Sequence, residues 1–213
     1  MLTITSPAAT TDLTTLAAVK AELGITTTTD DAYIATLIAA ASAAAVAWCR
    51  RTFAHTGYSE TFRPSSLTGG YSGSPASSRL RLGAWPVASV VSVAEGTAPL
   101  APTDYELDAE AGILWRLDAA GNRIAWPNSK ITVAFSAGWL LPNEVGRTLP
   151  VDIERAAILL TKTSYMARAR DPLVKAESVA GVLDTQFWVG AVGASSLLPE
   201  AENLLAPYRL PPI

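Results

Sequence analysis

Cysteine and histidine are nearly absent from this sequence. Its 213 residues include one cysteine, Cys49, and one histidine, His55. One cysteine excludes an internal disulfide and fits a protein that folds in a reducing cytosol. One cysteine and one histidine cannot fill a zinc site, and the acidic residues do not follow the spacing of metal ligands. We therefore expect neither a disulfide nor a bound metal.

Charged residues are scarce and show no excess of basic ones. They make up 16% of the sequence and give a net charge of -3, whereas an average domain contains about 25%. Domains that bind DNA on their own usually carry an excess of lysine and arginine, so the sequence has no global signature of DNA binding. The low charge has two explanations: part of the surface is buried in an assembly, or an alanine-rich composition reflects a GC-rich genome.

Long, strongly hydrophobic runs are missing as well. The N-terminal stretch "MLTITSPAATTD" has no basic region followed by an apolar one, so it does not read as a signal peptide. The longest apolar run, residues 34–48, is interrupted by Thr36 and Ser42 and consists largely of alanine. It falls short of the roughly 20 strongly apolar residues that cross a bilayer. We expect a soluble protein.

No group of residues predicts catalysis or cofactor binding. Cys49 lies in an alanine-rich segment, where a buried thiol packs as a small apolar side chain. His55 has no carboxylate close to it in sequence before Glu60 and fits a surface position. The glycine-rich "TGGYSGS" is not followed by the Lys-Ser/Thr of a phosphate-binding loop. We expect no catalytic residues, no cofactor and no enzyme activity.

Two helices are predicted near the N-terminus. The first begins at Asp12 or Thr14 and ends at Gly24, because glycine readily adopts the left-handed conformation that stops a helix. The second follows a cap at Asp30 or Asp31. Its apolar positions recur at helical spacing along one face, which consists of Ile34, Leu37, Ile38, Ala41, Ala45 and Trp48.

A third main helix is predicted near the C-terminus. It begins after Pro150 and ends around Arg170, with an expected inner face of Ile153, Ala157, Leu160 and Ser164. The following "VLDTQFWVGAVGASS" is typical of a strand or extended segment, "PEAENLLAPY" of a short amphipathic helix, and "RLPPI" of a tail without regular structure.

The region between the second and third helices predicts strands. Six short segments rich in β-branched and aromatic residues are separated by turn residues: "YSETF", "RLRL", "VASVVSV", "DYELD", "ILWRL" and "KITVAF". The fold class is therefore α+β, a small bundle of three main helices with an inserted antiparallel β subdomain and an extended C-terminal tail. We expect N-terminal helices in residues 1–57, the β insertion in 58–148, and the completing helix and tail in 149–213.

Six residues are candidates for an interface. Arg50 and Arg51 are expected in the last turn of the second helix, and Arg168 and Arg170 at the end of the third, where cations are favoured by the helix dipole. These arginines are either a DNA contact or a surface for protein contacts. Two further candidates lie beside prolines in the tail and belong to residue types that often dominate interfaces, Tyr208 and Arg209.

The order of these parts resembles the head-tail connector, or adaptor, proteins of long-tailed bacteriophages and gene transfer agents. The resemblance rests on "LTTLAAVKAELGI", a long helix closing in "CRRTF", then "LRLGAWPVASVVSV", "DYELDAEAGILWRL", "KITVAFSAGW" and "LPVDIERAAILLTKTSYMARARDP". It covers residues 13–190.

The resemblance implies a structural protein of the virion neck, assembled in the cytoplasm of a bacterial host. Connector proteins of this type form rings, usually of twelve copies, under the portal protein, and the next neck or tail component, a stopper or tail terminator, follows. The expected partners are therefore the portal, that component and further copies of the chain. DNA is expected to pass through the channel without specific binding, and no membrane is involved. The alternative is a DNA-binding or packaging accessory protein.

Overall fold

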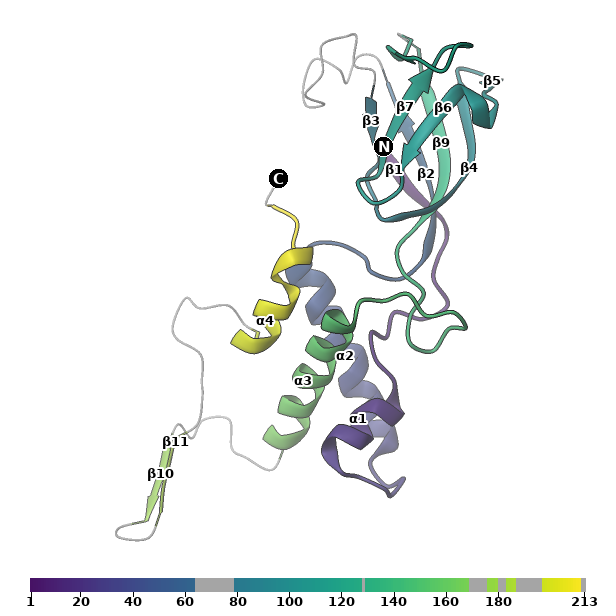
Figure 1. Cartoon of the computed structure of the whole chain (residues 1–213). Coiled ribbons are helices and arrows are strands. Elements are labelled where there is room, and N and C mark those ends of the chain that lie inside the picture. Colours follow the sequence, from purple (N-terminus) through teal and green to yellow (C-terminus); the bar gives the residue numbers. More distant parts are fainter. Residues whose placement is uncertain (64–78, 128, 169–175, 180–182, 187–196, 212–213) are drawn as a thin grey trace. The chain divides into compact units, whose positions relative to one another are not determined.

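The chain consists of a β unit and a helical unit (Figure 1). A computed structural model describes residues 1–63, 79–127, 129–168, 176–179, 183–186 and 197–211. The β unit comprises Met1–Thr10 and Thr52–Leu140, and the helical unit comprises Thr11–Arg51 and Leu141–Ile213. The fold is thus mixed α and β with antiparallel sheets, in agreement with the predicted class.

The β unit contains two antiparallel sheets. The first has the order β1-β2-β9-β4-β5, with β1 (Leu2–Ser6), β2 (Thr56–Phe62), β9 (Ile131–Ala137), β4 (Val87–Glu95) and β5 (Ala98–Pro99). The second has the order β3-β7-β6, with β8 paired to β7; its strands are β3 (Arg79–Arg81), β7 (Ile113–Leu117), β6 (Tyr105–Asp108) and β8 (Arg123–Ile124). A short 3-10 helix, η2 (Pro102–Asp104), precedes β6.

Alternating burial explains why these segments form strands. In β2 and β9 every second side chain is buried, as expected for strands with one face on a core. Tyr58 and Phe135 stack across these two strands with ring centroids 5.6 Å apart. The core also includes Phe62, Leu80, Leu82, Val87, Val93, Leu114, Trp126, Ile131, Val133 and Ala137.

All six predicted strands are confirmed, but the sequence missed β1, β5, β8 and the later β10 (Ala176–Val179). β1 lacks an inner face, since all five of its side chains are exposed, and β5 and β8 are two residues long. β1 pairs with β2, with Leu2 opposite Glu60 and Ile4 opposite Tyr58. Residues 1–10 therefore lie in the β unit, whereas the predicted division placed 1–57 with the helices.

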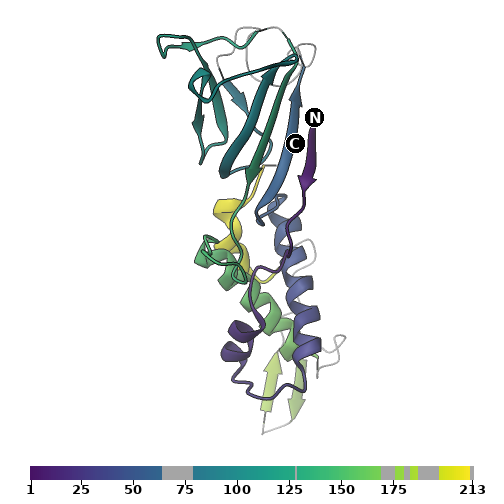
Figure 2. The same ribbon diagram turned by 90° about the vertical axis from the view of Figure 1, so that its right-hand side faces the viewer.

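The helical unit is built from α1 (Leu16–Leu23), α2 (Asp31–Cys49), α3 (Val151–Ala167) and α4 (Pro199–Leu205), and α4 continues into the 3-10 helix η3 (Ala206–Tyr208). Figures 1 and 2 both show α2 and α3 side by side. Val19, Ile34 and Ile38 form a buried cluster between α1 and α2, with Ile158 and Tyr165 of α3 packed against it. The described residues also include a hairpin of β10 (Ala176–Val179) and β11 (Leu183–Gln186).

Helix termini differ from the predictions in detail. Thr15, rather than Asp12 or Thr14, caps α1, and its side chain accepts a hydrogen bond from the Ala18 amide at 3.1 Å. Gly24 ends that helix with φ of 69°, as predicted. α2 ends at Cys49, so Arg50 and Arg51 lie beyond its last turn and not in it, because Arg50 itself takes the left-handed stop position.

The third and fourth helices follow the predicted pattern with two corrections. α3 ends at Ala167, earlier than expected, and Ser164 on its expected inner face is exposed. Thr161 is buried instead and bonds to the Ala157 carbonyl at 2.8 Å. The predicted short helix and irregular tail correspond to α4, η3 and residues 209–211. The predicted glycine-rich loop at 64–78 and most of the extended segment after 186 lie outside the described residues.

By length and composition the 19-residue α2 could cross a membrane, with a mean hydropathy of 1.8 over an 18-residue window. Its buried side chains face other parts of the helical unit, and they are Ile34, Ile38, Ala41, Ser42, Ala45 and Cys49. Many of its exposed positions are alanine. These contacts explain its apolar composition as that of a core helix.

Gly138 is the position where the backbone leaves least room for a side chain. Its φ is 102°, and a Cβ there would lie 2.5 Å from the Ala54 carbonyl oxygen. We expect Gly138→Ala to lower the free energy of unfolding by at least about 2 kcal/mol, measured by urea denaturation. Gly121→Ala is the matched control, because φ is 82° there but the space is open; it should cost about 1 kcal/mol. Equal losses would contradict the steric argument.

Candidate functional site

Cys49 is a packed residue at the end of α2. Its side chain is 0% exposed, and its Sγ lies 3.9 Å from the Leu205 carbonyl oxygen. Burial raises the pKa of this thiol to about 11, so the thiol is protonated at neutral pH and is a poor nucleophile. The prediction that Cys49 packs is therefore confirmed.

His55 lies at the start of β2 and shows no link to Cys49. Its backbone amide donates to the Trp139 carbonyl at 2.9 Å, which fixes the chain there. Within the part of the chain that the structure describes, no three His, Cys, Asp or Glu side chains gather as metal ligands would.

Arg168 belongs to a cluster that joins the N-terminal end of α2 to the C-terminal end of α3. Its Nη1 donates to Asp30 Oδ1 at 3.0 Å, and the Tyr165 hydroxyl donates to Asp30 Oδ2 at 2.6 Å. The Arg168 guanidinium also lies 5.2 Å from the ring centres of Tyr33 and Tyr165. Hydrogen bonds from Tyr165 and then Arg168 lower the pKa of Asp30. The charge of Arg168 is thus balanced within the chain.

Lys162, which lies on α3 before Arg168, is also paired. Glu22 on α1 accepts hydrogen bonds from Arg155 Nη1 and Lys162 Nζ, both at 2.7 Å. The bonds from Arg155 and Lys162 lower the pKa of Glu22 to about 2. Arg155, Lys162 and Arg168 therefore tie α3 to α1 and to the N-terminal end of α2. Arg170 and Lys175 lie outside the described residues.

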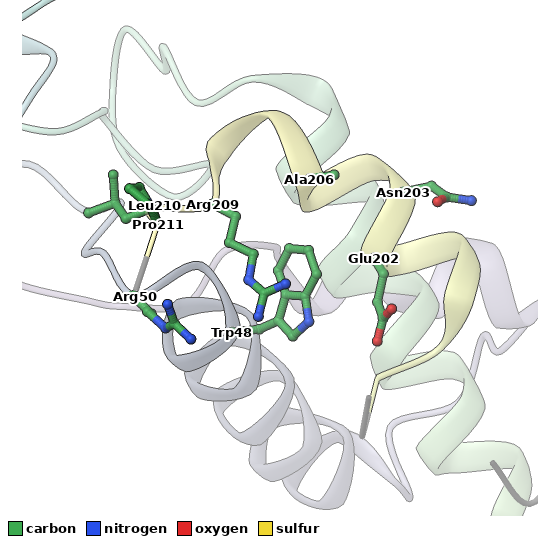
Figure 3. Close-up of a pocket in the computed structure, with 8 residues that line it drawn as sticks. All are labelled: Trp48, Arg50, Glu202, Asn203, Ala206, Arg209, Leu210 and Pro211. Atoms are coloured by element: carbon green, nitrogen blue, oxygen red, sulfur yellow. The ribbon is translucent and has the colours of Figure 1, made fainter. Parts of the chain in front are cut away.

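The other end of α2 forms one wall of an open pocket of about 750 Å³ (Figure 3). The C-terminal segment forms the opposite wall, so the lining comes from Trp48, Arg50, Glu202, Asn203, Ala206, Arg209, Leu210 and Pro211. The Arg209 guanidinium lies 4.4 Å from the centre of a Trp48 ring, a cation–π contact. The Leu210 amide donates to the Cys49 carbonyl at 3.0 Å. These two contacts hold the tail against the helix end.

Two opposite charges line this pocket without an ion pair. Among the described residues, neither the Arg50 side chain nor the Glu202 carboxylate has a hydrogen-bonding or ionic partner, and Glu202 Oε1 is buried. Arg50 is also strained. With φ of 57° it is the one non-glycine residue in the described chain with a positive φ, which costs about 1–2 kcal/mol.

The structure brings some of the predicted interface residues together and separates others. Arg50 and Arg209 share the pocket at the C-terminal end of α2. Arg168 lies at the other end of this 19-residue helix, where it binds Asp30. The two ends are about 28 Å apart along the helix axis. Tyr208 faces Asp152 on α3; burial and then that carboxylate raise the pKa of its hydroxyl, and Arg51 opposes this. Glu202 was not predicted, since "PEAENLL" shows an amphipathic helix but not which acid faces a pocket.

Comparison with known proteins agrees with the resemblance that the sequence predicted. The family profile described as "Phage gp6-like head-tail connector protein" matches residues 13–72, which cover α1, α2 and β2. No curated protein matches the chain at a significant level.

Solved structures with the same fold come from gene transfer agent (GTA) particles. A chain from the "Neck of empty GTA particle computed with C6 symmetry" is 17% identical with a TM-score of 0.58, covering 100% of this chain and 97% of its own length. A chain from the "Neck of native GTA particle computed with C12 symmetry" has the same values. A chain from the "Virion of native gene transfer agent (GTA) particle" is 16% identical with a TM-score of 0.57 and the same coverage. The similarity therefore extends over both units.

The Glu22 cluster predicts a pH dependence of stability. The pKa of Glu22 falls from 4.5 to about 2 on folding, so its stabilisation is present above about pH 4.5 and is lost as the pH falls through about 2. We expect Glu22→Gln to lower stability at pH 7 and to reduce the loss between pH 5 and pH 2, measured by urea unfolding. Glu110→Gln, at an exposed acid of the β unit, is the control. Identical pH profiles for the wild type and Glu22→Gln would contradict the assignment.

Proposed function

We propose that this chain is a structural subunit of a virion neck, in which a ring of identical copies joins the capsid to the tail. The main support is that its fold matches neck chains over 100% of its own length and 97% of theirs. The connector-family profile over residues 13–72 supports the same function independently. Nothing in the described residues resembles a catalytic group, and the proposed role needs neither an enzyme activity nor a cofactor.

We further propose that the ring contains twelve copies and surrounds a DNA channel. One neck with this fold was computed with C12 symmetry. A ring subunit buries two lateral faces, which suits a chain with 16% charged residues. DNA must also move through the channel, and a net charge of -3 disfavours tight binding of phosphates.

The partners in this proposal are the portal protein on the capsid side and a stopper or tail terminator on the tail side. The ring assembles in the cytoplasm of the bacterial host, as part of an infectious phage or a gene transfer agent, and no membrane takes part. Imaging the neck of purified particles by electron microscopy tests the proposal. A ring of this chain between portal and tail is expected, and particles whose neck lacks the chain would exclude it.

A DNA-binding accessory protein is the competing function, favoured by the exposed and unpaired Arg50. It would use Arg50, Arg51, Arg168 and Arg170, but Arg168 is already bound to Asp30.

Salt dependence distinguishes the two functions. A phosphate-driven binder shows a log–log slope of about -0.9 per phosphate contacted. We expect the purified chain to bind duplex DNA weakly and with a slope near zero, measured by fluorescence anisotropy. Tight binding with a steep slope, together with absence from the neck, would favour the accessory role.

The C-terminal tail is expected to serve attachment. We predict that a chain ending at Pro207 gives capsids that fill with DNA but join tails poorly or leak, scored by negative-stain microscopy. A chain ending at Leu210 is the control, because it keeps the Leu210–Cys49 hydrogen bond and the Arg209–Trp48 contact. The melting temperatures of both purified chains show whether the helical unit still folds. Normal tail joining by the shorter chain would refute a role for residues 208–213.

A further inference from the structure

The pocket at the end of α2 carries two charged groups that have no partner in the part of the chain that the structure describes. Arg50 stands on one side and Glu202 on another, and Figure 3 shows Trp48 between the Arg209 and Glu202 side chains. Every other acidic or basic side chain described in the helical unit takes part in a hydrogen bond, an ion pair, a ring contact or an electrostatic interaction within the chain. A buried carboxylate oxygen without a partner is costly, so its retention points to a ligand.

The conformation of Arg50 gives a second, independent observation. Glycine is the usual residue at a left-handed helix stop, because it has no Cβ to strain. An arginine here destabilises the isolated chain, and strained residues of this kind cluster at functional sites. Because the Arg50 side chain has no partner among the described residues, we assign its contribution to a contact with another molecule.

The chemistry of the pocket selects a protein segment over nucleic acid. A free cation and a free carboxylate together fit a ligand that carries both signs of charge, whereas Glu202 repels phosphate. Arg209 is already placed over Trp48. A volume of about 750 Å³ accommodates several side chains. The expected ligand therefore combines a basic residue, an acidic residue and apolar groups.

The loop before α3, together with the first turn of that helix, has this combination. Val145 is 100% exposed and Val151 is 70% exposed, although both are large apolar residues. Arg147 and Asp152 lie in the same stretch and are also exposed. Arg147 bonds to Glu154 at 2.6 Å, but a guanidinium has five donors and can serve a second carboxylate.

The placement of the two surfaces fits head-to-tail contact between copies. Figure 1 shows α4, which forms part of the pocket, on one side of α3 and the loop that leads into α3 on the other. Contacts between two different surfaces of identical subunits build rings when the rotation closes.

We propose that the pocket of one copy receives residues 145–152 of the next copy in the ring. In the incoming segment, Asp152 pairs with Arg50 of the pocket and Arg147 pairs with Glu202. Val145 and Val151 of that segment cover the apolar part of the pocket. This contact rests on the proposed function, since it assigns the surfaces through which neighbouring ring subunits meet.

Charge reversal tests the contact directly. Arg50→Glu or Asp152→Arg alone should lower the yield of tail-bearing particles at least about tenfold. Co-expression of the two variants should restore the yield, because copies that alternate around an even-numbered ring meet opposite charges at every junction. Variants that are monomer-stable but not rescued by each other, or single variants with normal yield, would overturn the proposed contact.

Arg50→Gly is a second test, for the case that a charge-reversed chain does not fold. It distinguishes an effect on assembly from an effect on folding. It relieves the left-handed strain, so the melting temperature of the purified chain should rise by about 2–4 °C, while the yield of tail-bearing particles should fall. Glu202→Gln should likewise keep the melting temperature and lower the yield, with Glu200→Gln, an exposed acid outside the pocket lining, as the matched control. Unchanged yields for both variants would overturn the proposal.

The occupant is identified by cross-linking. Cys49 is buried, so Asn203→Cys at the pocket rim provides a single accessible thiol for a benzophenone maleimide. We expect cross-links from assembled particles to residues 145–152 of a second copy. Cross-links to the portal, to DNA or within one copy would overturn the inference but leave the connector function intact. Absence of the chain from wild-type necks would instead remove the connector function itself.

Discussion

The helical unit depends on the return of its C-terminal segment to the end of α2. The Leu210 amide satisfies the Cys49 carbonyl at 3.0 Å, and Leu205 and Cys49 are both fully buried. Because a helix leaves its last carbonyls without intrahelical partners, this contact completes α2 with Leu210, 161 positions later in the chain than Cys49. It also forms the two walls of the pocket, so folding of the tail and formation of the candidate site are one event.

Charged residues make up only 16% of the chain, and most of those described in the helical unit interact with other residues of the same chain. Glu22 binds both Arg155 and Lys162, and Asp30 binds Arg168. Arg155, Lys162 and Arg168 therefore hold three helices together. Among the described residues of the helical unit, the charged groups left without an internal partner are Arg50 and Glu202, at the opposite end of α2.

Residue types and periodicity made the six predicted strands and the main helices predictable, and in β2 and β9 every second side chain is buried. β1 has no buried face, so only its pairing with β2 reveals it. The candidate site was half predictable: Arg50 and Arg209 stand out by type, but Glu202 joins them only through the docking of α4. Ion pairs between residues far apart in sequence, such as Glu22 and Lys162, 140 residues apart, cannot be predicted from a single sequence.

The two ends of the long segment Thr52–Leu140 of the β unit are held together by backbone contacts. Ala54 and Trp139 form a bridge, and the Trp139 amide donates to the Phe53 carbonyl at 2.8 Å. A segment of almost ninety residues thus leaves and rejoins the helical part of the chain at neighbouring points, apart from the strand contributed by the N-terminus. Such a module can be enlarged, exchanged or shortened in evolution without a change of register in the helices, so the surface that the β unit offers can vary while the helical framework stays the same.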